Sequence, residues 1–419
     1  MHLNITMRKT ATISCLWILS VISVCAQQVI KTDTDHFKTV RIDPANAIGG
    51  NVSDVFDQVN YIPLETTPES LFGNISQLEI VNDYYIILDY NTNSILVFTL
   101  NGKFHAKIKG SNSTIYKFLV NRWTNQIVYT RDNYQSMTYC DFDGKVIKTQ
   151  KNMDQNNLPI IFPSSYFISP DQLISYYPYS DMDTLSKYYQ PYTRSLLRFS
   201  KTEGNVYEIG MPYTKAETKI DVTHIGIGPL TTFGNDTSFF FAKPYTFTLY
   251  TVTPHSIKLV YKFIFPLLTS IPPDFVSNPA NNLKRVSFLQ KNQELIFSLN
   301  NCYQVGNNLL FEARSMAVNQ EDNLIYNFKS SDLIAYKHIL PDETSCFLPI
   351  YDKMSSNVGL AHCDGTFLYT SLSSLCLFKA NEENKGKKIK WPEALATYFA
   401  KGSKKNNPVI LQLKLKDNL

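Results

Sequence analysis

Several features that would place a chain directly in a functional class are missing from this sequence. Its seven cysteines include no Cys-x-x-Cys pair, and five of them lie beyond residue 26, which excludes a disulfide scaffold and indicates small buried apolar side chains. A formal net charge of +4 in 419 residues is too small to indicate nucleic-acid binding. No apolar run reaches the roughly 20 residues that span a bilayer, so we predict no transmembrane segment.

The short motifs of the common enzyme classes are absent as well. The chain contains no Gly-x-Ser-x-Gly elbow, no His-Glu-x-x-His pair, no phosphate-binding P-loop and no Gly-x-Gly-x-x-Gly dinucleotide fingerprint. His362-Cys363-Asp364 adjoins a predicted hairpin turn, and we interpret it as part of that turn. We therefore predict no cofactor, no metal site and no catalytic residue, which favours a protein that is not an enzyme.

The first 26 residues are typical of an export signal. Arg8-Lys9 forms a basic start, residues 13–24 are apolar, and Val24-Cys25-Ala26 fits a small-residue cleavage site before Gln27. The apolar run is too short to hold the chain in a bilayer by spanning it. We predict that residues 1–26 are a signal peptide and that the protein is exported, to the periplasm or to the cell surface and beyond.

Cys25 leaves a second interpretation of this segment open. An acylated Cys25 would be a lipid anchor and would tether the protein to a membrane. This alternative is less favoured, because a bacterial lipoprotein signal normally has a small residue where Val24 stands.

Aromatic residues are abundant, in contrast to all these absences. The chain has 26 tyrosines and 26 phenylalanines but 16 glycines. Aromatic and β-branched residues favour strands over helices. We therefore expect mostly β structure.

One pattern recurs six times along the chain: a short apolar strand, a tight polar turn and a second strand that opens with bulky residues. The predicted turns are Asn82-Asp83, Asn125-Gln126, Asp171-Gln172, Asn235-Asp236, Asn292-Gln293 and Asp364-Gly365. The second strands predicted after them are Tyr84 to Leu88, Ile127 to Thr130, Leu173 to Tyr177, Ser238 to Ala242, Glu294 to Leu299 and Thr366 to Tyr369.

A second hairpin follows the first in most of these units. Its predicted turns are Asn101-Gly102, Asp143-Gly144, Glu203-Gly204, Thr253 to Ser256 and Asn319 to Asn323. Asn-Gly and Asp-Gly are strong hairpin signals, because both central residues of such turns need a positive φ. Each unit is then a four-stranded antiparallel meander, the unit from which β-propellers are built. We predict an all-β, six-bladed β-propeller; a β-sandwich would not explain six similar hairpins in series.

The sixth unit lacks an outer strand of its own. Its third strand is predicted at Val409 to Lys416, so we expect Val59 to Leu64 to supply the fourth strand, close the ring and remove an exposed sheet edge. Residues 27–50 are then an N-terminal extension and residues 51–419 the propeller. Pro392 to Ala400, in the insertion before the last strand, is predicted to be a helix.

Three stretches of sequence carry a family resemblance. They are residues 56–66 (FDQVNYIPLET), residues 86–104 with Ile86-Ile87-Leu88-Asp89 and Asn101-Gly102, and Asn407-Pro408-Val409-Ile410-Leu411. The chain resembles, over about residues 40 to 419, a family of secreted six-bladed β-propellers of gut bacteria, with an architecture like that of NHL and TolB propellers. Most members have no assigned activity, so the resemblance implies the fold and no particular chemistry.

Ligand sites of propellers usually lie at one mouth of the central channel, among the loops that follow the second strand of each blade. These loops are predicted at Asp89 to Asn93, Arg131 to Gln135, Pro178 to Thr193, Lys243-Pro244, Asn300 to Asn307 and Ser371 to Pro408. The ligand-binding residues predicted there are Asp89, Arg131, Asp132, Tyr134, Tyr179, Asp181, Lys243, Tyr245, Asn300 and Tyr303. Tyrosine faces stack on sugar rings, while carboxylates, amides and arginine bind hydroxyl or acidic groups.

Two functions fit this set of residues. The first is a binding or interaction module that recognises a saccharide or a protein partner. The second is a hydrolase, lactonase or lyase at the channel mouth, in which Asp89, Asp132 and Asp181 would hold a metal or act as acid and base. We favour binding, because the enzymatic motifs are missing.

Overall fold

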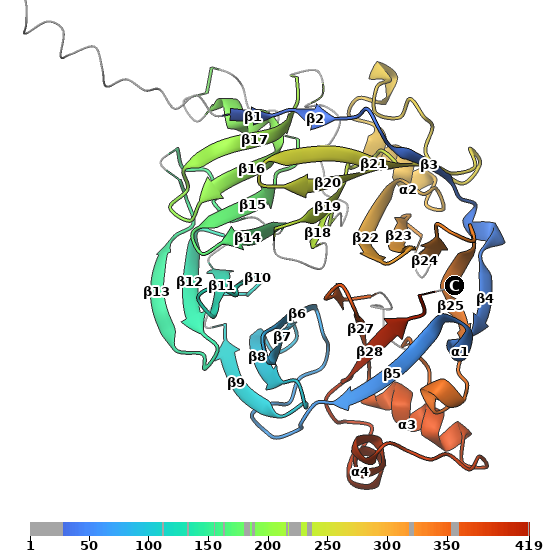
Figure 1. The fold of residues 1–419 in the computed structure, drawn as a ribbon. Coiled ribbons are helices and arrows are strands. Elements are labelled where there is room, and N and C mark those ends of the chain that lie inside the picture. Colours follow the sequence, from blue (N-terminus) through green and yellow to red (C-terminus); the bar gives the residue numbers. More distant parts are fainter. Residues whose placement is uncertain are drawn as a thin grey trace, which may run out of the picture.

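Six β-sheets surround a central axis and form a ring, as predicted (Figure 1). The computed structural model describes residues 28–419 apart from 111–112, 132–133, 155, 162–163, 180–184, 187–188, 215–216, 218–227, 233–236, 318–321, 353–359 and 418. The predicted signal peptide with Cys25, and the predicted turn Asn235-Asp236, lie outside the described residues. Among the described residues no helix has the length and apolarity needed to cross a membrane.

Each sheet is one blade, numbered here along the chain. Blade 1 consists of β6 (Gln77–Val81), β7 (Tyr84–Asp89), β8 (Ser94–Thr99) and β9 (Phe104–Lys109), and blade 2 of β10 (Phe118–Asn121), β11 (Gln126–Arg131), β12 (Ser136–Asp141) and β13 (Val146–Lys151). Blade 3 consists of β14 (Ser165–Ser169), β15 (Gln172–Tyr176), β16 (Ser195–Lys201) and β17 (Val206–Pro212), and blade 4 of β18 (Leu230–Thr232), β19 (Phe239–Ala242), β20 (Thr248–Thr253) and β21 (Ser256–Ile264).

Blades 5 and 6 complete the ring. Blade 5 consists of β22 (Ser298–Val305), β23 (Asn308–Arg314), β24 (Asp322–Asn327) and β25 (Leu333–Leu340), and blade 6 of β26 (His362–Cys363), β27 (Leu368–Leu372), β28 (Val409–Leu415) and β5 (Phe56–Pro63). The central strands β7 and β8 are almost fully buried, because apolar side chains on both faces pack against the neighbouring blades.

Blade 5 is the one blade whose predicted strands are wrong, displaced by one strand. Asn292 ends helix α2 (Arg285–Lys291) and is not in a hairpin turn, and the first turn of the blade is at Gly306-Asn307. The predicted loop Asn300 to Asn307 is largely the innermost strand. Asn300 and Asn301 imitate a turn in the sequence because the strand has a β-bulge there, with Asn301 at a φ of 47°.

The displacement carries through the rest of blade 5. The predicted second turn, Asn319 to Asn323, instead leads into the third strand, β24. The turn that joins the third and fourth strands lies at residues 328–332, where the Asn327 side chain accepts hydrogen bonds from the backbone N–H groups of Lys329 and Ser330, at 2.8 and 2.9 Å.

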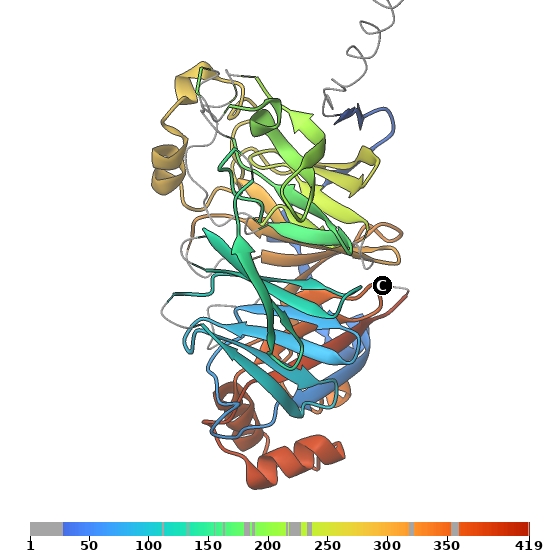
Figure 2. The same ribbon diagram turned by 90° about the vertical axis from the view of Figure 1, so that its left-hand side faces the viewer.

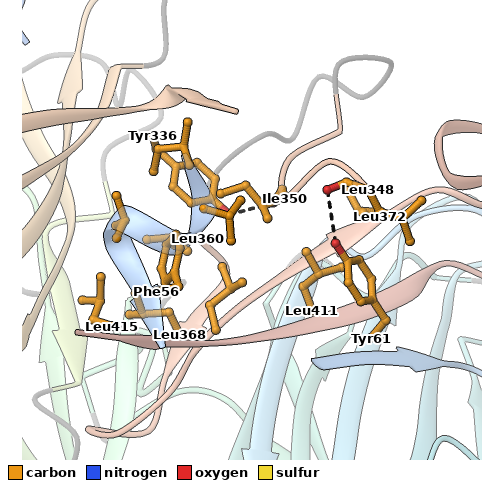
Figure 3. Packing of buried hydrophobic residues seen from close by; sticks show 14 of the residues in the cluster. Phe56, Tyr61, Tyr336, Leu348, Ile350, Leu360, Leu368, Leu372, Leu411 and Leu415 are labelled. Atoms are coloured by element: carbon orange, nitrogen blue, oxygen red, sulfur yellow. Dashed lines mark hydrogen bonds between the residues drawn. The ribbon is translucent and has the colours of Figure 1, made fainter. Parts of the chain in front are cut away.

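The ring is closed by the predicted N-terminal strand. β5 pairs antiparallel with β28, with Tyr61 opposite Leu411, and buries their apolar side chains together (Figure 3). The Tyr61 hydroxyl donates to the backbone oxygens of Ser345 at 3.1 Å and Leu348 at 3.3 Å. Blade 6 therefore combines an N-terminal strand with three C-terminal ones.

A buried asparagine secures this closure. Asn407, which precedes β28, donates through Nδ2 to the backbone oxygens of Glu65 at 2.8 Å and Ser70 at 3.0 Å, and its Oδ1 accepts from the N–H of Phe72 at 3.0 Å. Its own N–H donates to Thr66 Oγ1 at 2.9 Å. One amide thus binds the segment that leaves β5 to the segment that enters β28.

Residues 28–51, which we call the N-terminal strap, run along the outside of the ring (Figure 1, blue). β1 (Gln28–Ile30) pairs parallel with β17, β2 (Thr32–Asp33) and β3 (Lys38–Arg41) pair with β21, and β4 (Ile48–Asn51) pairs with β25. The strap thus covers the outer edges of blades 3, 4 and 5. It leads through the short helix α1 (Val52–Val55) into β5. Gly49 is needed in β4, since a Cβ there would lie 2.5 Å from the backbone oxygen of His338.

The two faces of the ring differ. Most long insertions follow the second strand of a blade or join successive blades, and we call the side on which they lie the long-loop face. It carries α2, whereas the C-terminus lies on the opposite side of the ring (Figure 2). The insertion of blade 6 forms α3 (Ser374–Glu383) and α4 (Glu393–Lys401), the latter within one residue of the predicted helix.

We expect the strap to contribute to stability through its buried side chains. Val40 of β3 is 3% exposed and packs against blades 4 and 5, whereas Val29 of β1 is 52% exposed. Val40→Asp would bury an unpaired carboxylate and lower the free energy of unfolding by about 3 kcal/mol or more. Val29→Asp would change it by less than about 0.5 kcal/mol. Urea denaturation of both variants measures the difference; equal effects would show that the strap is not bound as described.

Candidate functional site

Asp89, predicted as a ligand-binding residue, is fully buried at the end of β7. Its carboxylate accepts hydrogen bonds from the backbone N–H groups of Asn74 at 3.2 Å, Asn91 at 3.3 Å and Thr92 at 3.0 Å, and from the Thr92 hydroxyl at 2.7 Å. This geometry makes Asp89 the residue that shapes the loop after β7. The loop then presents Tyr90.

Three tyrosines meet on the long-loop face over blades 1 and 2. The rings of Tyr116 and Tyr134 lie 5.6 Å apart and 20° from parallel, and the Tyr90 hydroxyl donates to the backbone oxygen of Tyr116 at 2.8 Å. Tyr90 is 52% and Tyr116 43% exposed. We call these three residues the tyrosine platform; it contains one predicted site residue, Tyr134.

The platform is held from below by amide side chains. Asn93 accepts from the N–H of Ile115 at 2.8 Å and donates to the backbone oxygen of Ser113 at 3.0 Å, which fixes the segment that carries Tyr116. Asn152 donates to the backbone oxygen of Tyr134 at 2.8 Å. Tyr134 has a φ of 67°, a conformation unusual for tyrosine, so these contacts hold its ring where it stacks.

The other predicted residues do not join this platform. Arg131 stacks on Tyr129 of its own strand at 4.9 Å, Tyr179 packs edge-on against Tyr213 at 4.8 Å, and Tyr245 is buried 6.0 Å from the ring of Phe275. Lys243 is partly buried on the loop after β19, and burial lowers its pKa. Asp132 and Asp181 lie outside the described residues.

Asn300 and Tyr303 were expected on a loop, which is wrong. Both are buried on β22, the innermost strand of blade 5. Burial raises the pKa of Tyr303, and Tyr166, Cys363, Glu79 and Cys302 raise it further. Tyr303 is therefore close in space to residues of blades 1, 3 and 6.

These residues belong to a polar group at the centre of the ring, which we call the axial cluster: Glu79, Lys117, Tyr166, Tyr303 and His362. Glu79 of β6 lies 3.7 Å from His362 Nδ1 of β26, measured from Oε2. Lys117 Nζ lies 5.1 Å from the ring centroid of Tyr166, whose hydroxyl donates to the backbone oxygen of Leu230 at 3.1 Å. The cluster thus draws on the innermost strands of most blades.

The protonation states in the axial cluster are shifted by burial. The pKa of Lys117 falls to about 8, because burial disfavours the charged amine more than Glu79 stabilises it. Burial, with a smaller contribution from Glu79, raises the pKa of Tyr166. At neutral pH the cluster therefore combines neutral phenols with an amine that gives up its proton more easily than an ordinary lysine.

The channel below the cluster is narrow. A cavity of about 30 Å³ lies between the inner strands of blades 1 to 4 and is lined by Glu79, Val81, Leu119, Val120, Arg122, Trp123, Tyr166, Phe167, Thr232 and Phe239. That volume accommodates a water molecule or two, whereas sites for drug-sized ligands measure several hundred Å³. A sugar or peptide would therefore bind above the cluster, at the mouth where the platform lies.

Several of these residues were missed from the sequence. His362 was interpreted as part of a turn, which holds for Asp364, whose carboxylate accepts from the N–H groups of Thr366 and Phe367, but not for His362. Glu79 and Lys117 gave a usable signal, since each is a charged residue at or beside an innermost apolar strand. Among the described residues no group of three or more His, Cys, Asp or Glu side chains gathers as metal ligands would.

The lowered pKa of Lys117 predicts a pH dependence of stability. Between pH 8 and 10.5 the folded chain releases this proton while the unfolded chain keeps it, so the folded state gains stability as pH rises. Relative to Lys117→Met, the wild type should become more stable by about 1–3 kcal/mol across this window. Urea denaturation of both proteins at pH 7, 9 and 10 measures the difference. A difference independent of pH would mean that the amine is not perturbed.

The ring resembles solved propellers. A crystal structure from Bacteroides fragilis NCTC 9343, of a protein to which export has been ascribed, is 16% identical, with a TM-score of 0.62 over 90% of this chain and all of that one. A DUF4221 family member from Bacteroides vulgatus ATCC 8482 is 11% identical, with a TM-score of 0.47 over 86% of this chain and 98% of that one.

More remote matches follow the same pattern of low identity. The WD40 repeats of RRP9 are 10% identical, with a TM-score of 0.37 over 86% of this chain and 98% of that one. No curated protein matches the sequence. The model of a domain of unknown function, DUF4934, matches residues 38–414, nearly the whole propeller with part of its strap. The chain therefore belongs to the DUF4934 family.

Proposed function

We propose that this protein is an exported binding module that recognises a saccharide at the channel mouth, with the tyrosine platform as its stacking surface. The observation that carries the proposal is the geometry of Tyr90, Tyr116 and Tyr134. Two of these rings are exposed to solvent by about half, although tyrosines elsewhere in the described chain are mostly buried. Exposed aromatic faces held in fixed positions suit the apolar faces of sugar rings.

The supports beneath the platform favour recognition over mere surface decoration. Asp89, Asn93 and Asn152 each direct several hydrogen bonds to the loops that carry the rings. Lys117 follows Tyr116 in the chain and reaches from the platform toward the axis. A sugar stacked on Tyr116 would have hydrogen-bonding groups within reach of this amine. A protein partner at the same loops is the second candidate for a binding module.

The alternative, a channel-mouth hydrolase, lactonase or lyase, is supported by one observation. Glu79, His362 and Lys117 place an acid, an imidazole and a readily deprotonated amine at the bottom of the mouth. Such groups can transfer protons. Mass spectrometry of a bound oligosaccharide after prolonged incubation separates the two functions, since a binding module returns it intact.

The platform yields a direct test. In a panel of neutral and uronic-acid-containing oligosaccharides, we expect at least one to bind, and Tyr116→Ala to weaken that binding about threefold to tenfold, because one stacking contact contributes about 0.5–1.5 kcal/mol. Phe37→Ala is the matched control, since Phe37 is an aromatic residue of the strap that is 42% exposed. Isothermal titration measures both. Unchanged binding in Tyr116→Ala, or equal loss in the two variants, would reject the platform.

Export is proposed on the basis of the leader sequence and is supported by the similar fold of the Bacteroides fragilis protein. Expression in a Bacteroides host should yield a mature chain that begins at Gln27. Mass spectrometry of the purified protein gives its first residue. A chain that begins at an acylated Cys25 would show a lipid anchor, and an uncleaved chain in the cytoplasm would contradict export.

A further inference from the structure

Arg198 is a buried arginine for which the surrounding protein provides no acceptor. It lies in the middle of β16 and is 5% exposed. Its Nε atom has no hydrogen-bond partner among the described residues, and within that part of the chain no carboxylate forms an ion pair with it. A cation held in this way costs several kcal/mol unless something compensates for the lost hydration.

The walls around Arg198 are tyrosine rings. The guanidinium carbon lies 3.4 Å from the ring centroid of Tyr177 and 5.2 Å from that of Tyr192. Burial raises the pKa of Tyr177 to about 12, even though Arg198 lowers it, and burial with Asp154 raises the pKa of Tyr192. Both phenols are therefore neutral at physiological pH. They offer Arg198 their π faces and no negative charge.

The carboxylate of this neighbourhood is already occupied. Asp154 accepts the Tyr192 hydroxyl at 2.6 Å through Oδ2, and the N–H groups of Asn156 at 2.7 Å and Leu158 at 2.9 Å through Oδ1. Its charge offsets part of that of Arg198 from a distance. It gives the guanidinium no hydrogen bond.

A second buried arginine in the same chain shows the contrast. Arg285 of α2 donates through Nε to the backbone oxygen of Phe275 at 3.0 Å, through Nη2 to that of Val276 at 2.8 Å, and through Nη1 to Asn282 Oδ1 at 3.3 Å. Where the fold uses an arginine as an internal tie, it provides oxygen atoms for the N–H groups. Arg198 has the rings but lacks the oxygens.

We propose that Arg198, with Tyr177 and Tyr192 as walls, forms an anion-binding subsite for a carboxylate, phosphate or sulfate group. The guanidinium presents parallel N–H groups that match two oxygens of such an anion, and the rings confine it laterally. The ligand supplies the acceptor atoms that the protein omits.

This subsite is connected to the tyrosine platform. Asn152 donates both to the backbone oxygen of Tyr134, at 2.8 Å, and to that of Ile161, at 3.0 Å. Tyr177 donates to the neighbouring oxygen of Ile160 at 3.2 Å. The inference deepens the proposed function and rests on it for the source of the anion, which we take to be the acidic group of a saccharide.

The test uses the mature protein, residues 27–419, with sodium phosphate, sodium sulfate, sodium glucuronate and sodium chloride at matched ionic strength. Phosphate and sulfate stabilise many proteins by exclusion from the surface, so each shift in melting temperature is compared with that of Arg198→Met. We expect a saturable shift in the wild type that is lost in Arg198→Met, and affinity reduced at least tenfold in Arg198→Lys. The matched control, Arg285→Met, should be less stable but keep the anion response.

The outcomes separate the two proposals. Equal anion responses in the wild type and Arg198→Met, or a wild type without any saturable response, would overturn the subsite. A phosphate response that persists in Tyr116→Ala supports the subsite whether or not the platform binds sugar. A response to glucuronate at lower concentration than to phosphate identifies the acidic sugar as the source, whereas the reverse order identifies a phosphorylated ligand and removes the link to the platform.

Discussion

The pairing of β5 with β28 is the interaction on which the rest of the structure depends. Wedge-shaped sheets surround an axis only if the last touches the first, and Glu79 and His362 approach to 3.7 Å across that junction, from blades 1 and 6. Asn407 binds the two partner segments at the start of the seam with four hydrogen bonds. The axial cluster, and any site above it, therefore presupposes that the seam is closed.

Polar groups are distributed unevenly along the axis. The lower channel is narrow and lined mainly by apolar residues such as Val81 and Phe239. The charged groups lie above it, and the exposed rings lie at the mouth. This gradient from water to apolar core resembles that of a binding site that is closed at one end. It explains how Lys117, one residue from an exposed tyrosine, has a pKa near 8.

The sequence predicts repeats well and their exceptions poorly. Five blades and the closing strand follow from apolar runs and Asn-Gly-type turns, because those signals are local. Blade 5 fails because Asn300 and Asn301 occupy a bulge, and a bulge and a turn both favour amides. The candidate site was predicted only in part, since Tyr134 lies on a loop that can be identified, whereas the meeting of Glu79, Lys117 and His362 depends on the ring and not on neighbours in sequence.

The seam also fixes the order in which the molecule can be completed. Asn60 and Gln412, whose side chains are joined by a 2.8 Å hydrogen bond, are 352 positions apart, and the strap docks on blades made long after it. The first segments to leave the ribosome are thus among the last to find their partners. Contacts so distant in sequence slow folding, because the intervening chain must first be brought together. A nascent chain of this protein keeps open sheet edges until its final strand is available, so it would remain competent for passage through a translocation channel during the whole of its synthesis.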